Sequence, residues 1–132
     1  MDIKVSQEQG NIPVTVFHIE GRINMGNTEE LENLAQQYYQ TGMRDLVLDL
    51  QEVPSLTSAA LRTILSIYKM LSAPQGVSTE VGMDTENQAG PGNSKHFKLA
   101  NPSEYVLKVL QTSGFNRYLE IYDNLADAVA SF

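Results

Sequence analysis

Apolar and polar positions alternate along this chain with two periods, the two-residue period of strands and the roughly 3.6-residue period of helices. Residues 46–50 are apolar except for Asp49 and predict a buried strand. Pro54 ends this pattern, because proline donates no backbone hydrogen bond and keeps the residue before it away from helical angles. A helical pattern follows, with apolar side chains on one face at Leu61, Ile64, Leu65, Tyr68 and Leu71. The chain is therefore expected to be organised around a strand, a loop and a helix over residues 46–71.

A β-hairpin is predicted at the start of the chain. Residues 2–8 alternate in the manner of an edge strand, and residues 12–19 form a second strand. Gly10 and Asn11 give the turn signal between them. The second strand is expected to place Ile12, Val14, Val16 and His18 on one face and Thr15, Phe17 and Ile19 on the other.

A helix is predicted between this hairpin and the central strand. Asn27 is expected to cap it, with Glu30 at capping-box spacing, and Gly42 stands in the glycine position that ends many helices. A strand–helix–strand connection of this kind favours parallel pairing of the two strands.

Residues 72–94 differ in composition from the rest of the chain. They include four glycines, two prolines and three acids, with no lysine or arginine. Such a segment buries too little apolar surface to offset the entropy lost on ordering, so a long flexible loop is expected at about residues 73–95. Two interpretations stay open, an arm that contacts a partner and a tolerated insertion.

Two further strand–helix units are predicted after this segment. A short strand at residues 95–100 leads to a helix that Asn101 is expected to cap, with Pro102 at its first position. A last strand at residues 118–122 leads to a terminal helix that Asp123 is expected to cap. The inner face of the first of these helices is expected to consist of Tyr105, Val106, Val109 and Leu110.

The alternation of strands and helices predicts one α/β domain over residues 1–132. We expect a mixed sheet of four to five strands with about four α-helices. Helices are expected on one face, which would leave the other face partly covered by the N-terminal hairpin or open to solvent.

Composition narrows the classes of function. The chain has 132 residues and a net charge of −7, from 16 acidic and 9 basic residues, which argues against a nucleic-acid-binding protein. It has no cysteine, and therefore no disulfide, cysteine metal site or thiol nucleophile. The N-terminus lacks a signal-peptide pattern, and no apolar run reaches the roughly 18 residues of a membrane span. We expect a cytoplasmic protein that binds no membrane, metal or cofactor.

Catalytic patterns are not evident in the sequence. Neither His18 nor His96 belongs to an evident carboxylate pattern, so each is interpreted as a packed or surface histidine. Glu29 and Glu30 lie where a first helical turn favours acids, and they are assigned to the helix dipole. No Ser/His/Asp order, metal-ligand spacing or nucleotide fingerprint was found, and we expect that the protein is not an enzyme.

Two hydroxyls, Thr57 and Ser58, stand where the central helix is expected to begin. One interpretation is that they only cap the helix, which stabilises it by about 1 kcal/mol. The other is that Ser58 accepts a phosphate, because a helix N-terminus presents unpaired N–H groups and partial positive charge to an anion.

The sequence around these hydroxyls resembles the STAS domain of bacterial anti-sigma factor antagonists. The family's strand end is similar to Asp49-Leu50. Its Asp-Ser-(Ser/Thr)-Gly-Leu motif is similar to Thr57-Ser58-Ala59-Ala60-Leu61, with Thr57 in place of the aspartate and Ala60 in place of the glycine. Further similar segments are Gly21-Arg22-Ile23-Asn24, Leu110-Gln111-Thr112-Ser113-Gly114-Phe115 and residues 120–128.

The resemblance implies a protein-interaction switch in transcription regulation. The unphosphorylated form would bind an anti-sigma factor that is also a serine protein kinase, and phosphorylation of Ser58, or alternatively Thr57, would end that interaction. The implied partner-binding residues are Asn24, Thr57, Ser58, Ala59, Ala60 and Leu61.

Two alternatives stay open, the first of them because of the departures at Thr57 and Ala60. The chain would be a degenerate STAS module that binds a signalling or scaffold partner without phosphorylation, or a STAS domain that binds a small ligand. The sequence gives no indication of the oligomeric state.

Overall fold

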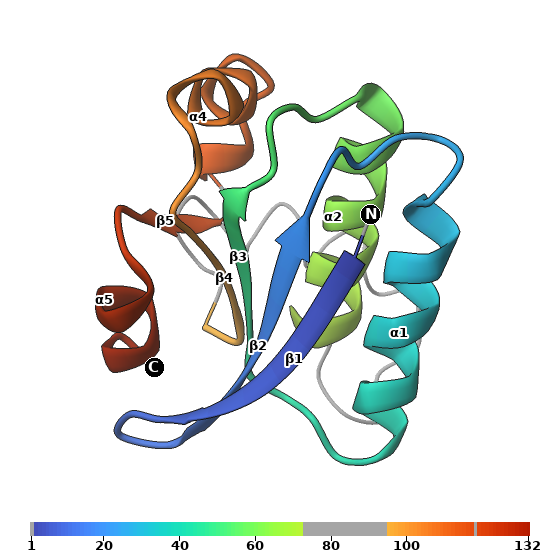
Figure 1. Ribbon diagram of the computed structural model, residues 1–132. Coiled ribbons are helices and arrows are strands. Elements are labelled where there is room, and N and C mark those ends of the chain that lie inside the picture. The colour runs from blue at the N-terminus through green and yellow to red at the C-terminus, as the bar shows by residue number, and fades with distance from the viewer. Residues whose placement is uncertain (1, 73–94, 118) are drawn as a thin grey trace.

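The computed structural model describes residues 2–72, 95–117 and 119–132. The loop expected at about residues 73–95 lies outside this range except for Lys95. The described elements, shown in Figure 1, are β1 (Asp2–Gln9), β2 (Pro13–Glu20), α1 (Thr28–Gln40), β3 (Leu46–Glu52), α2 (Ser58–Ser72), β4 (Phe97–Ala100), α4 (Glu104–Thr112), a 3-10 turn (Phe115–Arg117), β5 (Glu120–Tyr122) and α5 (Leu125–Ala130).

The five described strands form one mixed sheet in the order β1-β2-β3-β4-β5. β1 pairs antiparallel with β2, and the remaining neighbours are parallel. The expected α/β class, hairpin and parallel crossover are therefore confirmed. Because β2, β3 and β4 are parallel, the loops that follow them leave the same edge of the sheet.

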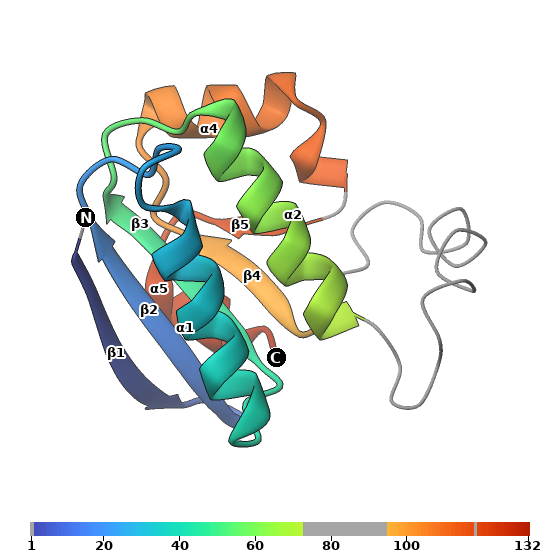
Figure 2. The same cartoon turned by 90° about the vertical axis from the view of Figure 1, so that its right-hand side faces the viewer.

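The larger core lies between one face of the sheet and helices α1, α2 and α4 (Figure 2). Phe17, Leu48 and Leu99 point from the strands into it, and Ile64 and Leu110 come from the helices; all five side chains are fully buried. The predicted alternation is confirmed for residues 14–19, since Val14 and Val16 face the opposite side, but Ile12 is exposed and lies before β2.

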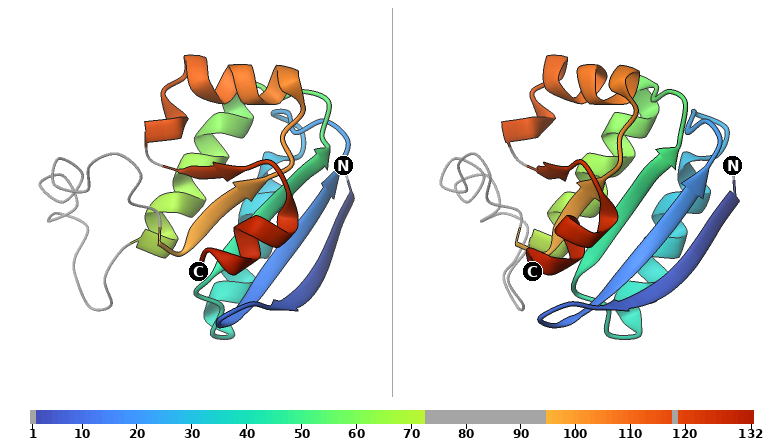
Figure 3. Two further views of the ribbon diagram at one scale, coloured as in Figure 1. Left: turned by 90° about the vertical axis from the view of Figure 1, so that its left-hand side faces the viewer. Right: turned by 60° about the vertical axis from the view of Figure 1, so that its left-hand side comes forward.

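The opposite face carries a second core, which corrects the expectation that this face would be left to the hairpin or solvent. Helix α5 covers part of this face (Figure 3). The hairpin does not cover it, because β1 and β2 are themselves strands of the sheet. The second core consists of Val14, Val16, Val47, Ala100, Ala128 and Val129.

Several helix boundaries differ from the sequence expectations. Helix α4 begins at Glu104, and Ser103 caps it by accepting a hydrogen bond from the Val106 N–H, so Asn101 is not the cap. Asn124, not Asp123, caps α5. In each case two capping residues stand close together in the chain, and local sequence did not distinguish them.

Asn27 does stand at the N-cap position of α1, but its side chain makes no cap hydrogen bond. It accepts instead from the Asn24 N–H and donates to the Arg22 carbonyl, which closes the loop between β2 and α1. The expected capping box is therefore wrong. In the part of the chain that the structure covers, no helix has the length and hydropathy needed to cross a membrane.

Candidate functional site

The loops that follow β2 and β3 are joined where they leave the sheet. Ile23 and Leu56 form an isolated parallel bridge outside the named strands. The Thr57 hydroxyl also donates a hydrogen bond of 3.3 Å to the Ile23 carbonyl. These contacts hold Asn24 beside the start of α2, so two segments about thirty residues apart in the sequence form one surface.

Thr57 is the N-cap of α2. Its Oγ1 accepts a hydrogen bond of 3.2 Å from the Ala60 N–H, the third helical amide, as expected for a capping hydroxyl. Ser58 is the first helical residue and is exposed to solvent. Among the described residues the Ser58 hydroxyl has no hydrogen-bond partner. Capping therefore belongs to Thr57 and leaves Ser58 accessible.

The three residues after Ser58 differ in their exposure. Ala59 and Leu61 are partly exposed, and Leu61 packs against the larger core. Ala60 is fully buried. Its methyl therefore points into the core, so Ala60 is not exposed on the surface with the other residues that the resemblance implies for partner binding.

The loop between β2 and α1 presents an exposed apolar side chain at this site. Asn24 shapes the loop, because its Oδ1 accepts from the Gly26 N–H and its carbonyl accepts from Asn27 and Thr28. The next residue, Met25, is 83% exposed. Sequence reasoning missed Met25, although an apolar residue between Asn24 and Gly26 was the available signal.

The electrostatics of this surface favour an anion at Ser58. The first turn of α2 contains no acidic residue, so its N-terminal N–H groups and partial positive charge are not offset within the helix. Arg62 is exposed and stands four residues after Ser58, on the same side of the helix. A phosphate on Ser58 would meet favourable charge within this chain.

A chain of polar contacts crosses β1, β2 and β3 on the face that carries α5. The His18 Nδ1 lies 2.8 Å from Asp49 Oδ2, and the His18 Nε2 lies 2.9 Å from the Ser6 hydroxyl. Asp49 also accepts from Asn101 Nδ2 at 3.3 Å and from the Gln51 N–H at 3.1 Å. Sequence reasoning missed this arrangement, because the three residues come from three strands.

The order Ser6–His18–Asp49 is that of an activated nucleophile, but the surroundings do not fit acyl transfer. Ser6 stands in the middle of β1, and its side chain projects perpendicular to the sheet. Nearby strand N–H groups lie in the plane of the sheet, so they do not form the paired donors that stabilise an oxyanion. We interpret this network as structural.

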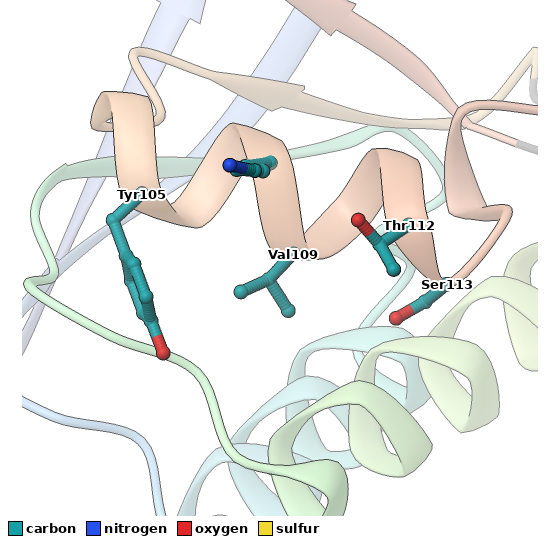
Figure 4. Close-up of a pocket in the computed structure, with 5 residues that line it drawn as sticks. Tyr105, Val109, Thr112 and Ser113 are labelled. Atoms are coloured by element: carbon teal, nitrogen blue, oxygen red, sulfur yellow. The ribbon is translucent and has the colours of Figure 1, made fainter.

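A shallow hollow of about 280 Å³ lies along α4 (Figure 4). Tyr105, Lys108, Val109, Thr112 and Ser113 line it. Tyr105 is 58% exposed, which corrects its assignment to the inner face of this helix. In Figure 4 its ring projects from α4 in the direction of the loop before α2. Within the described ranges no group of histidine and acidic residues could hold a metal ion.

The loops that follow β2 and β3 lie within the part of the chain that matches a known family. The STAS domain profile matches residues 4–80, more than half of the chain. This chain belongs to the STAS domain family. The match includes Asn24 and the whole start of α2, the two parts of the surface described above.

Relatives of this STAS domain carry the names of regulators. BtrV of Bordetella bronchiseptica, named as an anti-sigma factor antagonist, is 26% identical over 114 residues, which cover 86% of this chain and 82% of BtrV. The structure of an anti-sigma factor antagonist from Mycobacterium paratuberculosis has a TM-score of 0.71 at 20% identity. The match covers 98% of this chain and 93% of that chain.

A third similar structure is that of SpoIIAA, an anti-sigma factor antagonist in its unphosphorylated form. Its TM-score is 0.59 at 14% identity, and the match covers 96% of this chain and 92% of that chain. At this identity the likeness concerns the fold. The mixed five-stranded sheet and four helices of the described residues match the SpoIIAA-like STAS fold.

Proposed function

We propose that this STAS domain is an anti-sigma factor antagonist controlled by phosphorylation of Ser58. The unphosphorylated surface binds an anti-sigma factor that is also a serine protein kinase, and this binding frees the sigma factor for transcription. Phosphorylation of Ser58 by the same partner ends the interaction. The protein acts as a cytoplasmic binding switch and not as an enzyme.

The observation that carries this proposal is the division of roles between Thr57 and Ser58. Thr57 caps α2, and the neighbouring Ser58 is exposed at the helix N-terminus. The Ser58 hydroxyl is thus accessible to a kinase, and its modification leaves the cap in place. A phosphate there adds about −1.5 to −2 charges to a surface that a partner must desolvate.

The surrounding residues support a binding surface at this point. Asn24, Thr57, Ser58, Ala59 and Leu61 come together through the Ile23–Leu56 bridge. Met25, exposed beside Asn24, adds the kind of adaptable apolar contact that binding surfaces use. Ala60 supports the surface from the core side and does not contact the partner.

A second candidate is a STAS module that binds its partner without phosphorylation. It is favoured by Thr57, which caps the helix but supplies no carboxylate beside Ser58. Thr57 as the phosphate acceptor is disfavoured, because its hydroxyl is committed to Ala60 and Ile23.

Intact-mass and site-mapping spectrometry of the protein from its own cells tests the proposal first. A single phosphate on Ser58 is expected, and its absence under varied growth conditions favours the second candidate. The next test uses the wild-type chain, Ser58→Ala and Ser58→Asp as baits in the same cells. The first two are expected to recover an anti-sigma factor kinase, and Ser58→Asp is expected to recover much less.

Ser72→Asp is the matched control, because Ser72 is an exposed serine at the other end of the same helix. It is expected to recover the kinase as the wild type does. Equal recovery by Ser58→Asp and Ser72→Asp contradicts control at Ser58.

A further inference from the structure

β1 is the edge strand of the sheet that the described residues form, and no described strand pairs with its outer side. It is the first strand in the sheet order and pairs only with β2 among the described strands. It runs for eight residues, Asp2–Gln9, without proline or glycine. Figure 3 shows it at the margin of the sheet, clear of α5. An edge of this length presents a row of backbone groups that another strand can pair with.

The hydrogen-bond pattern identifies which of these groups face outward. The Thr15 N–H donates to the Asp45 carbonyl, so Thr15 points its backbone toward β3. Backbone direction alternates along a strand, so Val14, Val16 and His18 point toward β1. Their partners in β1 are Glu8, Ser6 and Lys4, respectively. The outward backbone groups of β1 therefore belong to Ile3, Val5, Gln7 and Gln9.

Charge and length of overlap together favour one of the ways in which β1 can pair with itself about a two-fold axis. An axis at Lys4 opposes Lys4 to its own copy, and an axis at Val5 opposes Asp2 to Glu8. Both arrangements place like charges opposite each other, which is unfavourable. An axis at Ser6 opposes Lys4 to Glu8 twice, and it pairs the outward backbone groups of Val5 with those of Gln7.

The Lys4 and Glu8 side chains are available for this pairing. They would form pairs without direct backbone hydrogen bonds, in which opposed side chains approach closest. The Lys4 amino group is 3.9 Å from Glu20, and the Lys4 side chain is 76% exposed, so this ion pair is weak. Glu8 accepts only a long hydrogen bond of 3.3 Å from Ser6 among its described contacts.

We propose that two copies of this chain associate through β1, antiparallel, about a two-fold axis at Ser6. The dimer is one continuous sheet to which each copy contributes its five described strands. Lys4 of each copy pairs with Glu8 of the other. Because the two copies run in opposite directions, their Ser58 surfaces lie at opposite ends of the sheet and stay accessible. The proposal is independent of phosphorylation at Ser58.

Disulfide trapping tests the register directly, because the chain has no cysteine. In Ser6→Cys the two thiols face each other at the axis, at the Cα separation that a disulfide accepts. Mild oxidation is expected to convert most of this variant to a covalent dimer. Glu8→Cys is the matched control and is expected to stay uncrosslinked, since its two copies lie on opposite sides of the axis. Crosslinking of Glu8→Cys, or none in Ser6→Cys, overturns the proposal.

Charge reversal tests the same dimer without a covalent bond. Sedimentation equilibrium of the full chain is expected to show a monomer–dimer equilibrium that Lys4→Glu or Glu8→Lys weakens about tenfold. The double variant is expected to restore the wild-type affinity. The control variants Lys108→Glu and Glu104→Lys, at exposed positions on α4, are expected to leave the dimer affinity unchanged. A wild-type chain that stays monomeric, or a dimer indifferent to both single reversals, overturns the proposal whatever the result at Ser58.

Discussion

The His18 imidazole and the Asp49 carboxylate join adjacent strands, with 2.8 Å between Nδ1 and Oδ2. A carboxylate only accepts hydrogen bonds, so Nδ1 carries the proton in this contact. The Asp49 side chain is only 11% exposed, and Asn101 and the Gln51 N–H hold it from other directions. The pair therefore holds β2 and β3 together near the ends from which the two loops of the candidate site leave the sheet.

Removing this carboxylate is expected to destabilise the fold. Asp49→Ala removes the acceptor shared by the part-buried donors of His18 and Asn101 and should lower the free energy of unfolding by about 1–2 kcal/mol. Asp45→Ala is the matched control, because His96 and Asp45 form a contact of the same length with a half-exposed imidazole. Its loss should be under about 1 kcal/mol. Urea denaturation measures both, and equal losses would contradict the structural role given to Asp49.

Thr57 is expected to matter for stability and Ser58 is not. Thr57→Ala removes the cap of α2 and should lower the free energy of unfolding by about 1 kcal/mol, whereas Thr57→Asp keeps the cap. Ser58→Ala should change it by less than about 0.5 kcal/mol. Thermal and urea unfolding of the three variants are the measurements. A larger loss of stability in Ser58→Ala than in Thr57→Ala would show that Thr57 is not the residue that caps α2.

Negative charge at the two ends of α2 is expected to act in opposite directions. Ser58→Asp places a carboxylate at the positive end of the helix and should raise stability by about 0.3–1 kcal/mol, and Ser72→Asp should lower it by a similar amount. Both effects should shrink in high salt. This comparison also verifies that any loss of partner binding in Ser58→Asp does not come from unfolding.

Gly10 is expected to tolerate no side chain. A methyl group there would lie 2.7 Å from the Val129 carbonyl oxygen of α5, so the hairpin turn or the helix has to move. Gly10→Ala should cost about 1–3 kcal/mol of stability, as overpacking usually does. Gln9→Ala, at the exposed neighbouring position, is the control and should be close to neutral. If the two variants are equally stable, the turn does not pack against α5 as described.

Tyr122 is expected to make stability sensitive to alkaline pH. Burial raises the pKa of its phenol above the ordinary value of 10.0, and a hydrogen bond to Glu120 raises the pKa further. The folded state thus holds this proton more tightly than the unfolded state does. The resulting stability is present in full below the ordinary tyrosine pKa and is lost as the pH rises through the folded-state pKa.

Urea denaturation at several alkaline pH values measures this effect. The wild type is expected to lose stability more steeply with pH than Tyr122→Phe. An absorbance titration of the tyrosines should show that the same substitution removes a late-titrating group. Identical pH dependence in the two proteins would contradict the raised pKa.

Local sequence was sufficient for the order of the elements and for the faces of the strands. The alternation of Val14 and Val16 with Phe17 and Ile19 gave the two sides of β2 correctly, because strand geometry sends successive side chains to opposite faces. The resemblance at residues 57–61 likewise pointed to the STAS domain family, which the comparison confirmed.

The contacts between distant segments were decided by the tertiary structure alone. His18 contacts Asp49 because the two residues are partners in the register of β2 and β3. Asn101 does not cap a helix; its backbone is in the left-handed conformation, with φ of 56°, and its side chain donates to the same carboxylate. The periodicity of a strand fixes which way a side chain points but not which strand lies beside it. Strand order and register decide that, and they result from the packing of the whole chain.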